Sequence, residues 1–596
     1  MASLKLYCQL QRRFSSARAP HKSQIKQVSR LDFAESLDEI KARISESQFV
    51  AISLTTSGTS SSSWHSVSSI DTRQTAYLKS KHAAERFQIF QLSICPFTIC
   101  GSKVTAYPYG FHLFPREEQN TGAPCYSFSC QSSVLKSLAS QGFDFNTCIY
   151  NGISYLSREQ ESAALNRLGF LIPVTESSSS LSSRSVADSI FCERTKSLLR
   201  HWRNTSLAST NTDHDPLIRS LRKVLYPSED FHSRSSISIS INSERQASLV
   251  AEIIQEFHDD LVPLIVKGKE GIFEAVRVVL TTSNEDKALL LKEIEESEEK
   301  LKKQLRGFRE VIEFISDSQK PLVSRHSLND LIFVYSKFVG SLPSAVDEFE
   351  DLTSSIFPHV IDVNNLMNGV SPQRRGRNLS MAMSHLKNHF FAPFSLEIPN
   401  QVSLEDDEVH GHPIVMTAHL LAKLFHILKI CPKSDQDGNI AKALTFENLQ
   451  STDGSEVKIW SNNTRNVKCA NVVFLWGFGD LMTARMVKNK LQESSFFHNM
   501  VFYVRLLEKN CAVIVFSNHD QANEFMLLTK SEADAFRETF PEGLKAAGYE
   551  LYDKVCKFGL WDAKLEDSLE KALNLDSNYH DASSISSDWL INFDDL

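Results

Sequence analysis

The ten residues from Phe49 to Gly58 constrain the fold of this chain most strongly. The run Phe-Val-Ala-Ile-Ser-Leu-Thr-Thr-Ser-Gly begins apolar and β-branched and leads into a Ser/Thr/Gly-rich segment. It predicts a buried strand that emerges at one end of a sheet, where small-molecule and phosphodiester chemistry tends to lie. Because residues i and i+2 of a strand share a face, Ser53 and Thr55 are the side chains that would face such chemistry together.

Length, charge and cysteine pattern limit the classes of protein to consider. A chain of 596 residues exceeds one ordinary core and predicts two to four domains. The formal net charge of -8 gives no overall basic field, so an RNA-binding surface would have to be a local patch. The 11 cysteines lack metal-ligand spacing and indicate reduced thiols. No apolar run approaches the ~20 residues of a membrane span, so we expect no membrane partner.

The N-terminus has a composition of its own. Lysines and arginines recur from Lys5 to Arg30, and no acid precedes Asp32. Apolar residues from Leu4 to Phe14 follow at roughly helical spacing. This composition is typical of an organellar transit peptide, which predicts a mitochondrial location. A frayed basic tail on a nuclear or cytoplasmic protein is the alternative.

The order of periodic segments predicts an interrupted α/β core. A helix is expected at 31–47, strands at 49–58, 87–95, 111–115 and 360–363, and helices at 132–142, 289–309 and 415–428. A Ser-rich linker and a smaller module with a strand at 237–241 and a helix at 247–257 separate the two halves. The sequence predicts a transit peptide at 1–30 and a core whose first half is 31–175 and second half is 283–430. Between these halves lie a linker at 176–187 and an inserted module at 188–282. A C-terminal domain at 440–577 and an acidic disordered tail at 578–596 follow.

The C-terminal segment shows a second pattern of alternating elements. Strands are expected at 472–476, 500–505 and 511–516, with helices at 481–491 and 521–528. That order resembles an RNA-recognition-motif (RRM)-like α+β fold. Four aromatic side chains on these strands could stack on RNA bases, although aromatic residues at such spacings are more often core: Phe474, Trp476, Tyr503 and Phe516.

Three blocks of sequence resemble the poly(A)-specific ribonuclease (PARN) family of DEDD-type deadenylases, particularly its plant branch. They run from Cys130 to Leu156, from Gly307 to Asp330, and from Tyr335 through Pro343 to Asp362. Together they cover most of residues 31–430. The segment 244–262 resembles the inserted single-strand-binding module of the family, although its Arg-x-x-x-His signature is absent.

The resemblance implies an α/β, RNase H-like exonuclease core that shortens poly(A) with two Mg²⁺ ions held by four acids. The first family motif reads Ala-Ile-Asp-x-Glu-x-x-Gly, and its two acids fall on Ser53 and Thr55. The third acid ends a Gly-His-Asn-x-x-Leu-Asp block and falls on Asp330. The fourth motif puts Glu408 at the general-base histidine and Pro413 at the last aspartate. Asp330 is therefore the single matching acid and the one candidate metal ligand.

One acid cannot hold two Mg²⁺ ions against water, because Mg²⁺ prefers several hard, charged oxygen ligands. Other residues could replace the missing acids. The acidic run from Glu405 to Glu408 could supply carboxylates, although such a run is more often a solvated loop. Glu408 with His410 and His412 could ligate a metal, although histidines two apart are common in exposed loops. Asp330 itself could be a relic held by a hydrogen bond at a helix start, and His326 a structural histidine near the lost one.

Three hypotheses follow. The first is a catalytically impaired PARN-like protein that binds poly(A) or other RNA 3′ ends, with no resident cofactor, in poly(A)-tail metabolism. The second is an active Mg²⁺-dependent 3′-exoribonuclease. The third is a scaffold subunit, because the family forms homodimers and this chain could pair with itself or with an active paralogue.

Overall fold

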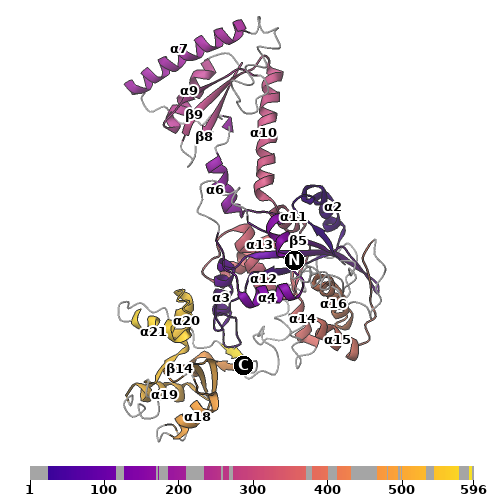
Figure 1. Ribbon diagram of the computed structural model, residues 1–596, viewed down its shortest axis with the longest axis vertical. Helices are drawn as coiled ribbons and strands as arrows, with labels where there is room; N and C mark the ends of the chain where they lie inside the picture. Colours follow the sequence, from indigo (N-terminus) through magenta and orange to yellow (C-terminus); the bar gives the residue numbers. More distant parts are fainter. Residues whose placement is uncertain are drawn as a thin grey trace, which may run out of the picture. The chain divides into compact units, whose positions relative to one another are not determined.

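The computed structural model describes most of the chain. The described residues are 25–115, 127–168, 172–173, 185–209, 234–256, 260–267, 273–370, 379–399, 412–430, 466–479, 481–493, 497, 500–531, 543–575 and 590–592. No helix within these ranges is both long and apolar enough to cross a membrane. The chain divides into two compact units, one comprising residues 1–114, 128–153 and 311–596 and the other 115–127 and 154–310 (Figure 1).

A mixed sheet forms the centre of the first unit. Its strand order is β1-β5-β3-β2-β10-β11, with β4 and β12 attached beside β3. The strands are β1 (Lys26–Val28), β2 (Phe49–Thr56), β3 (Ile89–Cys100), β4 (Lys103–Ala106), β5 (Tyr109–His112), β10 (Leu322–Ser324), β11 (Val360–Asp362) and β12 (Ser395–Glu397). β3 runs antiparallel to β2 and β5, whereas β2, β10 and β11 are parallel to one another. Setting β1 aside, this is the 3-2-1-4-5 order of an RNase H-like sheet.

The apolar helix α16 (Pro413–Ile427) packs on one face of this sheet. Its side chains share a buried cluster with Phe49 and Ala51 of β2 and with Val323 of β10. Helices α14 (Val363–Val370) and α15 (Leu379–His389) complete that cluster. Fifteen residues with twelve buried leave α16 no solvated side, which its nearly unbroken apolar sequence requires.

Other helices of the first unit flank the sheet or its connections. Helix α12 contacts β10, β11 and α3, and α13 contacts α3. The Tyr77 ring of α3 lies 5.2 Å from the Phe349 ring of α13. The bounds are α2 Phe33–Glu46, α3 Arg73–Arg86, α4 Ser132–Ser140, α5 Phe145–Asn151, α11 Arg309–Ser318, α12 Ser327–Val334 (continued as a π-helical turn, Tyr335–Val339) and α13 Val346–Ile356.

The predicted leader is too long at its C-terminal end. Residues 1–24 lie outside the described residues, but Ile25 and Val28 are buried. Lys26–Val28 form β1, which pairs in parallel with Tyr109–Phe111. Basic residues such as Lys26 misled the composition argument, because Lys26 sits on the exposed side of this strand and pairs with Glu39.

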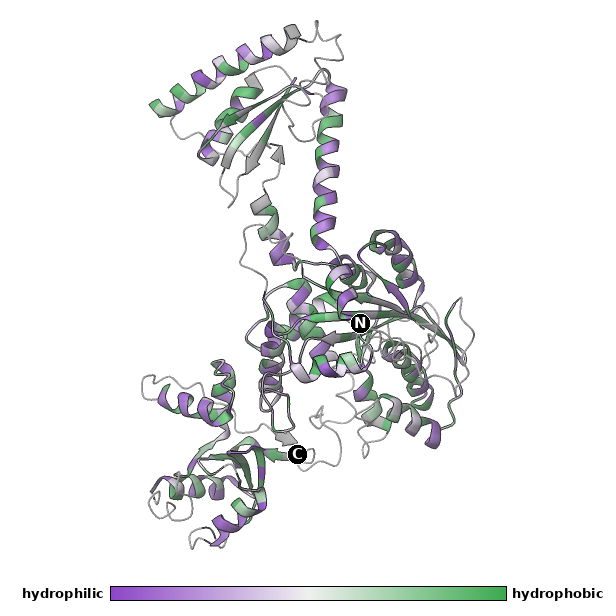
Figure 2. Cartoon of the chain, viewed as in Figure 1, coloured by the Kyte–Doolittle hydropathy of each residue, from purple (hydrophilic) through white to green (hydrophobic). Residues whose placement is uncertain are grey.

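The second unit is a four-stranded antiparallel sheet between helices. Its strand order is β6-β8-β9-β7, with bounds Ile172–Pro173, Leu261–Lys267, Phe273–Leu280 and Ser236–Ser240. Helices α7 (Val186–Ser209) and α9 (Glu244–Glu256) pack on one face. Leu290 and Ile294 of α10 (Asn284–Arg306) pack with Leu264 in a separate cluster. Hydrophilic and hydrophobic residues alternate along α10 (Figure 2), as expected for a helix with one solvated side.

This unit extends beyond the predicted limits of 188–282. Helix α6 (Arg158–Leu168) belongs to it, and α7 begins inside the predicted Ser-rich linker. Within this unit, Glu161 of α6 accepts hydrogen bonds from Arg306 and from the buried Arg309. The periodicity of α6 is weak because its pattern is mostly polar, so the sequence did not indicate it.

The C-terminal domain of the first unit has the element order βαββαβ, of which the sequence predicted the first five elements and missed the last strand. The chain runs β14, α18, β15, β16, α19, β17, and the sheet order is β15-β16-β14-β17. The elements are β14 (Val472–Trp476), α18 (Ala484–Glu493), β15 (Phe502–Glu508), β16 (Cys511–Phe516), α19 (His519–Ser531) and β17 (Lys545–Gly548). Two further helices follow, α20 (Tyr549–Lys557) and α21 (Leu565–Leu575). The tail predicted as disordered contains β18 (Leu590–Asn592), which pairs with β13 (Asn466–Lys468).

Gly307 should be intolerant of any side chain. Its φ of +51 lies in the left-handed region, and a Cβ there would meet the Ser154 carbonyl oxygen at 2.0 Å. We expect Gly307→Ala to lower the free energy of unfolding by roughly 3 kcal/mol or more, measured by urea denaturation. Gly142→Ala is the matched control: its φ is +80, but nothing lies within 4 Å, so it should cost only about 1–2 kcal/mol. Equal costs at the two positions would contradict this account.

Candidate active site

The carboxyl end of β2 brings the two residues of the first motif onto one face. Phe49 and Ala51 belong to the cluster under α16, so Ser53 and Thr55 project from the same face further along the strand. Both are half-buried. The Phe49 ring meets Phe425, near the C-terminal end of α16, at 5.7 Å. Helix α16 therefore runs against β2, and its N-terminus, Pro413, lies toward the Ser53–Thr55 end.

Asp330 reaches the same edge of the sheet through the neighbouring strand. Val323 of β10 pairs with Ala51, and Ser324 follows it. Asp330 lies in the first turn of α12, and its Oδ2 accepts a 2.5 Å hydrogen bond from the Ser324 hydroxyl. Burial raises the pKa of Asp330 to about 7, against the lowering effect of that hydrogen bond. The Ser324 hydroxyl is thus a hydrogen-bond donor to this partly buried carboxyl.

A second carboxylate near this edge has a structural partner set. Asp362 ends β11, opposite Ser324. Its Oδ2 accepts 2.8 Å hydrogen bonds from the Ser327 amide and hydroxyl, and its Oδ1 accepts from the Asn365 amide at 3.0 Å. Asp362 therefore caps α14 and ties the start of α12 to the end of β11. Burial raises the pKa of Asp362 in spite of these hydrogen bonds.

Arg325 and His326 are the basic groups beside the two acids. Burial lowers the pKa of Arg325, while Asp330 and Asp362 act in the opposite direction. Burial also lowers the pKa of His326, whose Nδ1 lies 3.2 Å from the Asn364 amide nitrogen. The residue as a whole is nonetheless exposed to solvent and its ring contacts the Asn364 side-chain amide, so the structure does not place His326 in the core as a structural histidine.

The start of α16 carries no acid among the described residues. Pro413 occupies the first helical turn, where its missing N–H costs no hydrogen bond. His412 is the N-cap, and its Nδ1 accepts from the Ile414 amide at 3.4 Å. Burial lowers the pKa of His412 to about 4. Glu408 and His410 lie outside the described residues.

The donor set described at this edge does not fit a pair of Mg²⁺ ions. It consists of two hydroxyls, from Ser53 and Thr55, and two carboxyls, of which Asp330 is bonded to Ser324 and Asp362 to Ser327 and Asn365. Mg²⁺ requires near-octahedral coordination by hard oxygens, and neutral hydroxyls are poor substitutes for carboxylates. Within the ranges that the structure describes, no group of three or more His, Cys, Asp or Glu residues could hold a metal ion.

Three of the four residues considered for base stacking are core residues. Phe474, Trp476 and Phe516 are at most 2% exposed. Phe516 packs beneath α18 and α19, whereas Phe474 stacks on Tyr552 of α20 with ring centroids 4.6 Å apart. Tyr503 is 49% exposed, and the Lys488 ammonium lies 5.6 Å from its ring centroid. The stacking prediction is therefore wrong for these three, and the core role that was its alternative holds. For Phe474 and Trp476 the reason is that side-chain alternation alone could not reveal the cover by α20 and α21.

The sequence did not indicate the role of Ser324. It follows the apolar pair Leu322–Val323 at the end of a three-residue strand, and Asp330 lies six positions further along the chain. That spacing, strand end to first helical turn, is the signal that could have identified the pair. The sequence also did not indicate the capping role of Asp362, because that role depends on how α12 and α14 are placed.

The strand order of the central sheet defines an α/β protein of RNase H-like architecture. The model of the CAF1 family ribonucleases matches residues 28–544. The chain is 43% identical to "Poly(A)-specific ribonuclease PARN-like" of Arabidopsis thaliana over 96% of both chains. It is 27% identical to "Poly(A)-specific ribonuclease PARN" of the same plant, covering 92% of this chain and 87% of the relative. The chain therefore belongs to the CAF1 family, as a member of its PARN-like poly(A)-specific ribonuclease group.

A solved structure gives a weaker likeness. The S. pombe Pop2p structure, an Mg²⁺- and Mn²⁺-bound form, matches with a TM-score of 0.29 and 10% sequence identity, covering 68% of this chain and 92% of that one. A TM-score of this size does not establish a shared fold. The RNase H-like architecture rests instead on the strand order of the central sheet.

Replacing Asp330 by asparagine should stabilise the protein in alkali. The folded pKa of about 7 lies above the ordinary value of 3.8, so the favourable contribution of the neutral acid is complete below pH 3.8 and is lost as the pH rises through 7. Asp330→Asn removes that loss. We expect the change in the free energy of unfolding caused by Asp330→Asn to be more favourable at pH 8.5 than at pH 5, by roughly 1–3 kcal/mol.

Urea denaturation at the two pH values measures this difference. Asp317→Asn, at an exposed position of α11, is the control and should show the same small effect at both. If Asp330→Asn instead destabilised the protein equally at pH 5 and pH 8.5, the carboxyl would be ionised and favourably bound in the native state. That result would contradict the geometry described here.

Proposed function

We propose that this chain is a catalytically impaired member of its family that binds RNA 3′ ends, particularly poly(A), in poly(A)-tail metabolism. One observation carries the impairment. Where the family motif calls for two acids, β2 presents the hydroxyls of Ser53 and Thr55 on the α16 side of the sheet. Without charged ligands there, a second divalent ion has no place beside Asp330.

The environment of Asp330 supports the same conclusion. The resemblance aligns Ser324 with the glycine that opens the Gly-His-Asn-x-x-Leu-Asp block. Glycine has no side chain, whereas the Ser324 hydroxyl donates directly to Asp330 Oδ2. A carboxyl with one oxygen bonded in this way and a raised pKa is a weak ligand for a hard cation at neutral pH. Asp330 therefore takes part in a hydrogen bond within the protein core.

RNA as the ligand rests on the relatives. The Arabidopsis protein that is 43% identical over almost the whole chain is named as a poly(A)-specific ribonuclease-like protein. Retention of both the core and the inserted unit over 96% of the chain favours retention of the surface that contacts RNA. A self-pair or a pair with an active paralogue belongs to the same proposal, as does a mitochondrial location directed by residues 1–24.

The parent chain should not shorten a poly(A) substrate. We expect a 5′-labelled oligo(A) of twenty nucleotides to remain intact with Mg²⁺ or Mn²⁺, because the acids that bind both ions are missing. Denaturing gel electrophoresis measures the shortening, with an active poly(A)-specific ribonuclease as the positive control. Metal-dependent release of 5′-AMP by the parent, lost in Asp330→Ala, would refute the impairment.

Binding to RNA should survive the loss of chemistry. We expect filter binding to give tighter association with poly(A) than with poly(U). We also expect the logarithm of the affinity to fall linearly with the logarithm of the salt concentration, because neutralised phosphates release counterions. Salt-independent or undetectable binding at 50 mM salt would remove RNA from the proposal and favour the scaffold hypothesis.

A further inference from the structure

The sheet of the C-terminal domain is covered on the face that would be expected to meet RNA. Val473 and Leu475 of β14 pack beneath α18 and α19, so Phe474 and Trp476 point to the opposite face. In RRM domains, aromatic residues on the sheet stack on bases. Here the Phe474 ring stacks on Tyr552, and Trp476 Nε1 donates to Glu570 Oε1 of α21 at 3.4 Å. At β14 this face of the sheet is therefore occupied by protein, whereas Tyr503 of β15 remains 49% exposed.

Helix α20, which provides that cover, also contacts the core of the first unit. The Tyr552 hydroxyl donates to Asp71 Oδ1 at 2.6 Å. The Tyr549 hydroxyl donates to the Ile70 carbonyl oxygen at 3.0 Å and accepts from the Thr72 amide at 3.0 Å. Both tyrosines are buried. The two rings thus lie between the sheet and residues 57–72, here called the post-β2 segment.

A buried ion pair fixes the acceptor of these hydrogen bonds. Asp71 Oδ2 accepts from Lys79 Nζ of α3 at 2.9 Å, and both side chains are at most 1% exposed. The same oxygen accepts from the Ser68 amide at 2.7 Å, and Lys79 Nζ also donates to the Ser66 carbonyl oxygen. Every described contact of this pair leads to the post-β2 segment, α3 or Tyr552. Removing one partner would leave an uncompensated charge in the core.

Stacked rings make a second attachment next to the ion pair. The Trp561 ring lies between His82 of α3 and Trp64 of the post-β2 segment, with centroid distances of 4.6 and 5.5 Å. Trp64 Nε1 donates to the Asp562 carbonyl oxygen at 3.0 Å. Burial lowers the pKa of His82 to about 4, so its ring is neutral in this stack at neutral pH. Offset or edge contacts of this kind favour a fixed arrangement.

We infer that the C-terminal βαββαβ domain is an intramolecular clamp on the post-β2 segment and does not use its sheet as an RNA platform. Its partner is this chain's own α3 and post-β2 segment, joined through α20 and Trp561. The clamped segment leaves β2 directly after Thr56, so the domain fixes how the strand carrying Ser53 and Thr55 continues. This role is independent of whether the chain binds RNA elsewhere.

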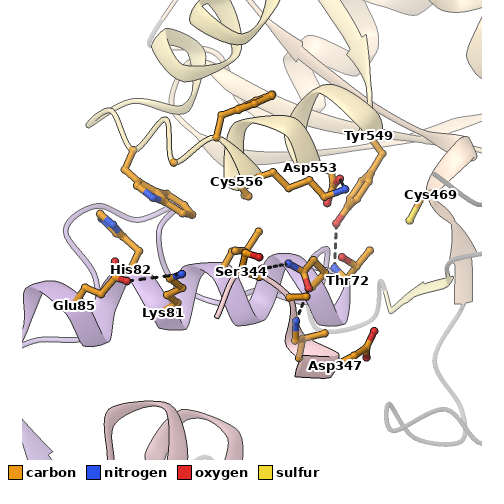
Figure 3. Close-up of a pocket in the computed structure, with 18 residues that line it drawn as sticks. Thr72, Lys81, His82, Glu85, Ser344, Asp347, Cys469, Tyr549, Asp553 and Cys556 are labelled. Atoms are coloured by element: carbon orange, nitrogen blue, oxygen red, sulfur yellow. Dashed lines mark hydrogen bonds and ion pairs between the residues drawn. The ribbon is translucent and has the colours of Figure 1, made fainter. Parts of the chain in front are cut away.

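Open space beside the clamp supplies a control position. A cleft of about 900 Å³ lies between α3, residues 344–347 and α20 (Figure 3). Phe558 lines this cleft but is 62% exposed, in contrast to Tyr552 and Trp561 of the same region. Phe558→Ala therefore removes an aromatic ring beside the clamp without removing any of the contacts described above.

Hydrogen exchange measured by mass spectrometry on the full chain tests the clamp. Tyr552→Phe keeps the ring on Phe474 but removes the hydroxyl that donates to Asp71, and Trp561→Leu removes the middle ring of the stack. We expect each to speed amide exchange in residues 57–72 by at least tenfold, while β14 and β16 keep their protection. Phe558→Ala should exchange at the rate of the parent.

Two results would overturn the clamp. One is unchanged exchange of residues 57–72 in both variants. The other is exchange that rises equally throughout the chain, because the contacts would then stabilise the whole unit without holding this segment in particular. If Tyr552→Phe does not fold, Trp561→Leu alone decides between these outcomes.

A second experiment tests whether the sheet of the C-terminal domain binds RNA. Phe474→Leu and Trp476→Phe keep apolar side chains in place, and fluorescence anisotropy of a labelled oligo(A) measures binding by each full-length variant. We expect dissociation constants within twofold of the parent. A tenfold or greater loss of affinity with parental exchange in residues 57–72 would make the sheet an RNA platform and contradict the inference. If the parent itself binds no RNA, the proposed function fails, while the exchange experiment still decides the clamp.

Discussion

The carboxylate of Asp71 lies where water cannot solvate it, and the partners that neutralise it hold three parts of the first unit together. Lys79 of α3 supplies the opposite charge at 2.9 Å, the Ser68 amide fixes the post-β2 segment, and Tyr552 of α20 donates at 2.6 Å. A buried charge left without such partners is strongly unfavourable. The position of the C-terminal domain against α3 and the path of the chain after β2 therefore depend on one another.

The acids at the carboxyl edge of the central sheet obey the same constraint in a different way. Asp362 is satisfied by the amides that begin α12 and α14, and Asp330 is held by Ser324 with a raised pKa. In a metal-dependent nuclease, a cluster of acids at this edge is tolerated because divalent ions neutralise it. Here protein groups satisfy Asp330 and Asp362. The family's architecture is thus retained with an interior in which the described acids act as structural groups.

The fold could be predicted further than the site. The strand at 49–58, the helix at 415–428 and the first five elements of the C-terminal domain follow from local periodicity, and the structure has all of them. The last strand of that domain, β17, was not predicted. Helix α3 gave no such signal, because it is buried on several sides and includes Lys79 among its buried residues. Ser53, Thr55 and Asp330 come from the motif resemblance, and the parallel pairing of β10 with β2 puts the end of β2 and the start of α12 at the same edge of the sheet. Ser324 and the cover over Phe474 depend on contacts between distant segments, which periodicity does not encode.

The central claim is that this edge does not hold a pair of divalent ions. Titration of the full-length chain with Mn²⁺, followed by the electron paramagnetic resonance signal of the free ion, measures this directly, both alone and with bound oligo(A). The account predicts no more Mn²⁺ bound by the parent than by Asp330→Asn at concentrations up to about 1 mM, because neutral hydroxyls replace the charged oxygen ligands that such ions require. Binding of two Mn²⁺ ions per chain that is lost in Asp330→Asn would contradict it.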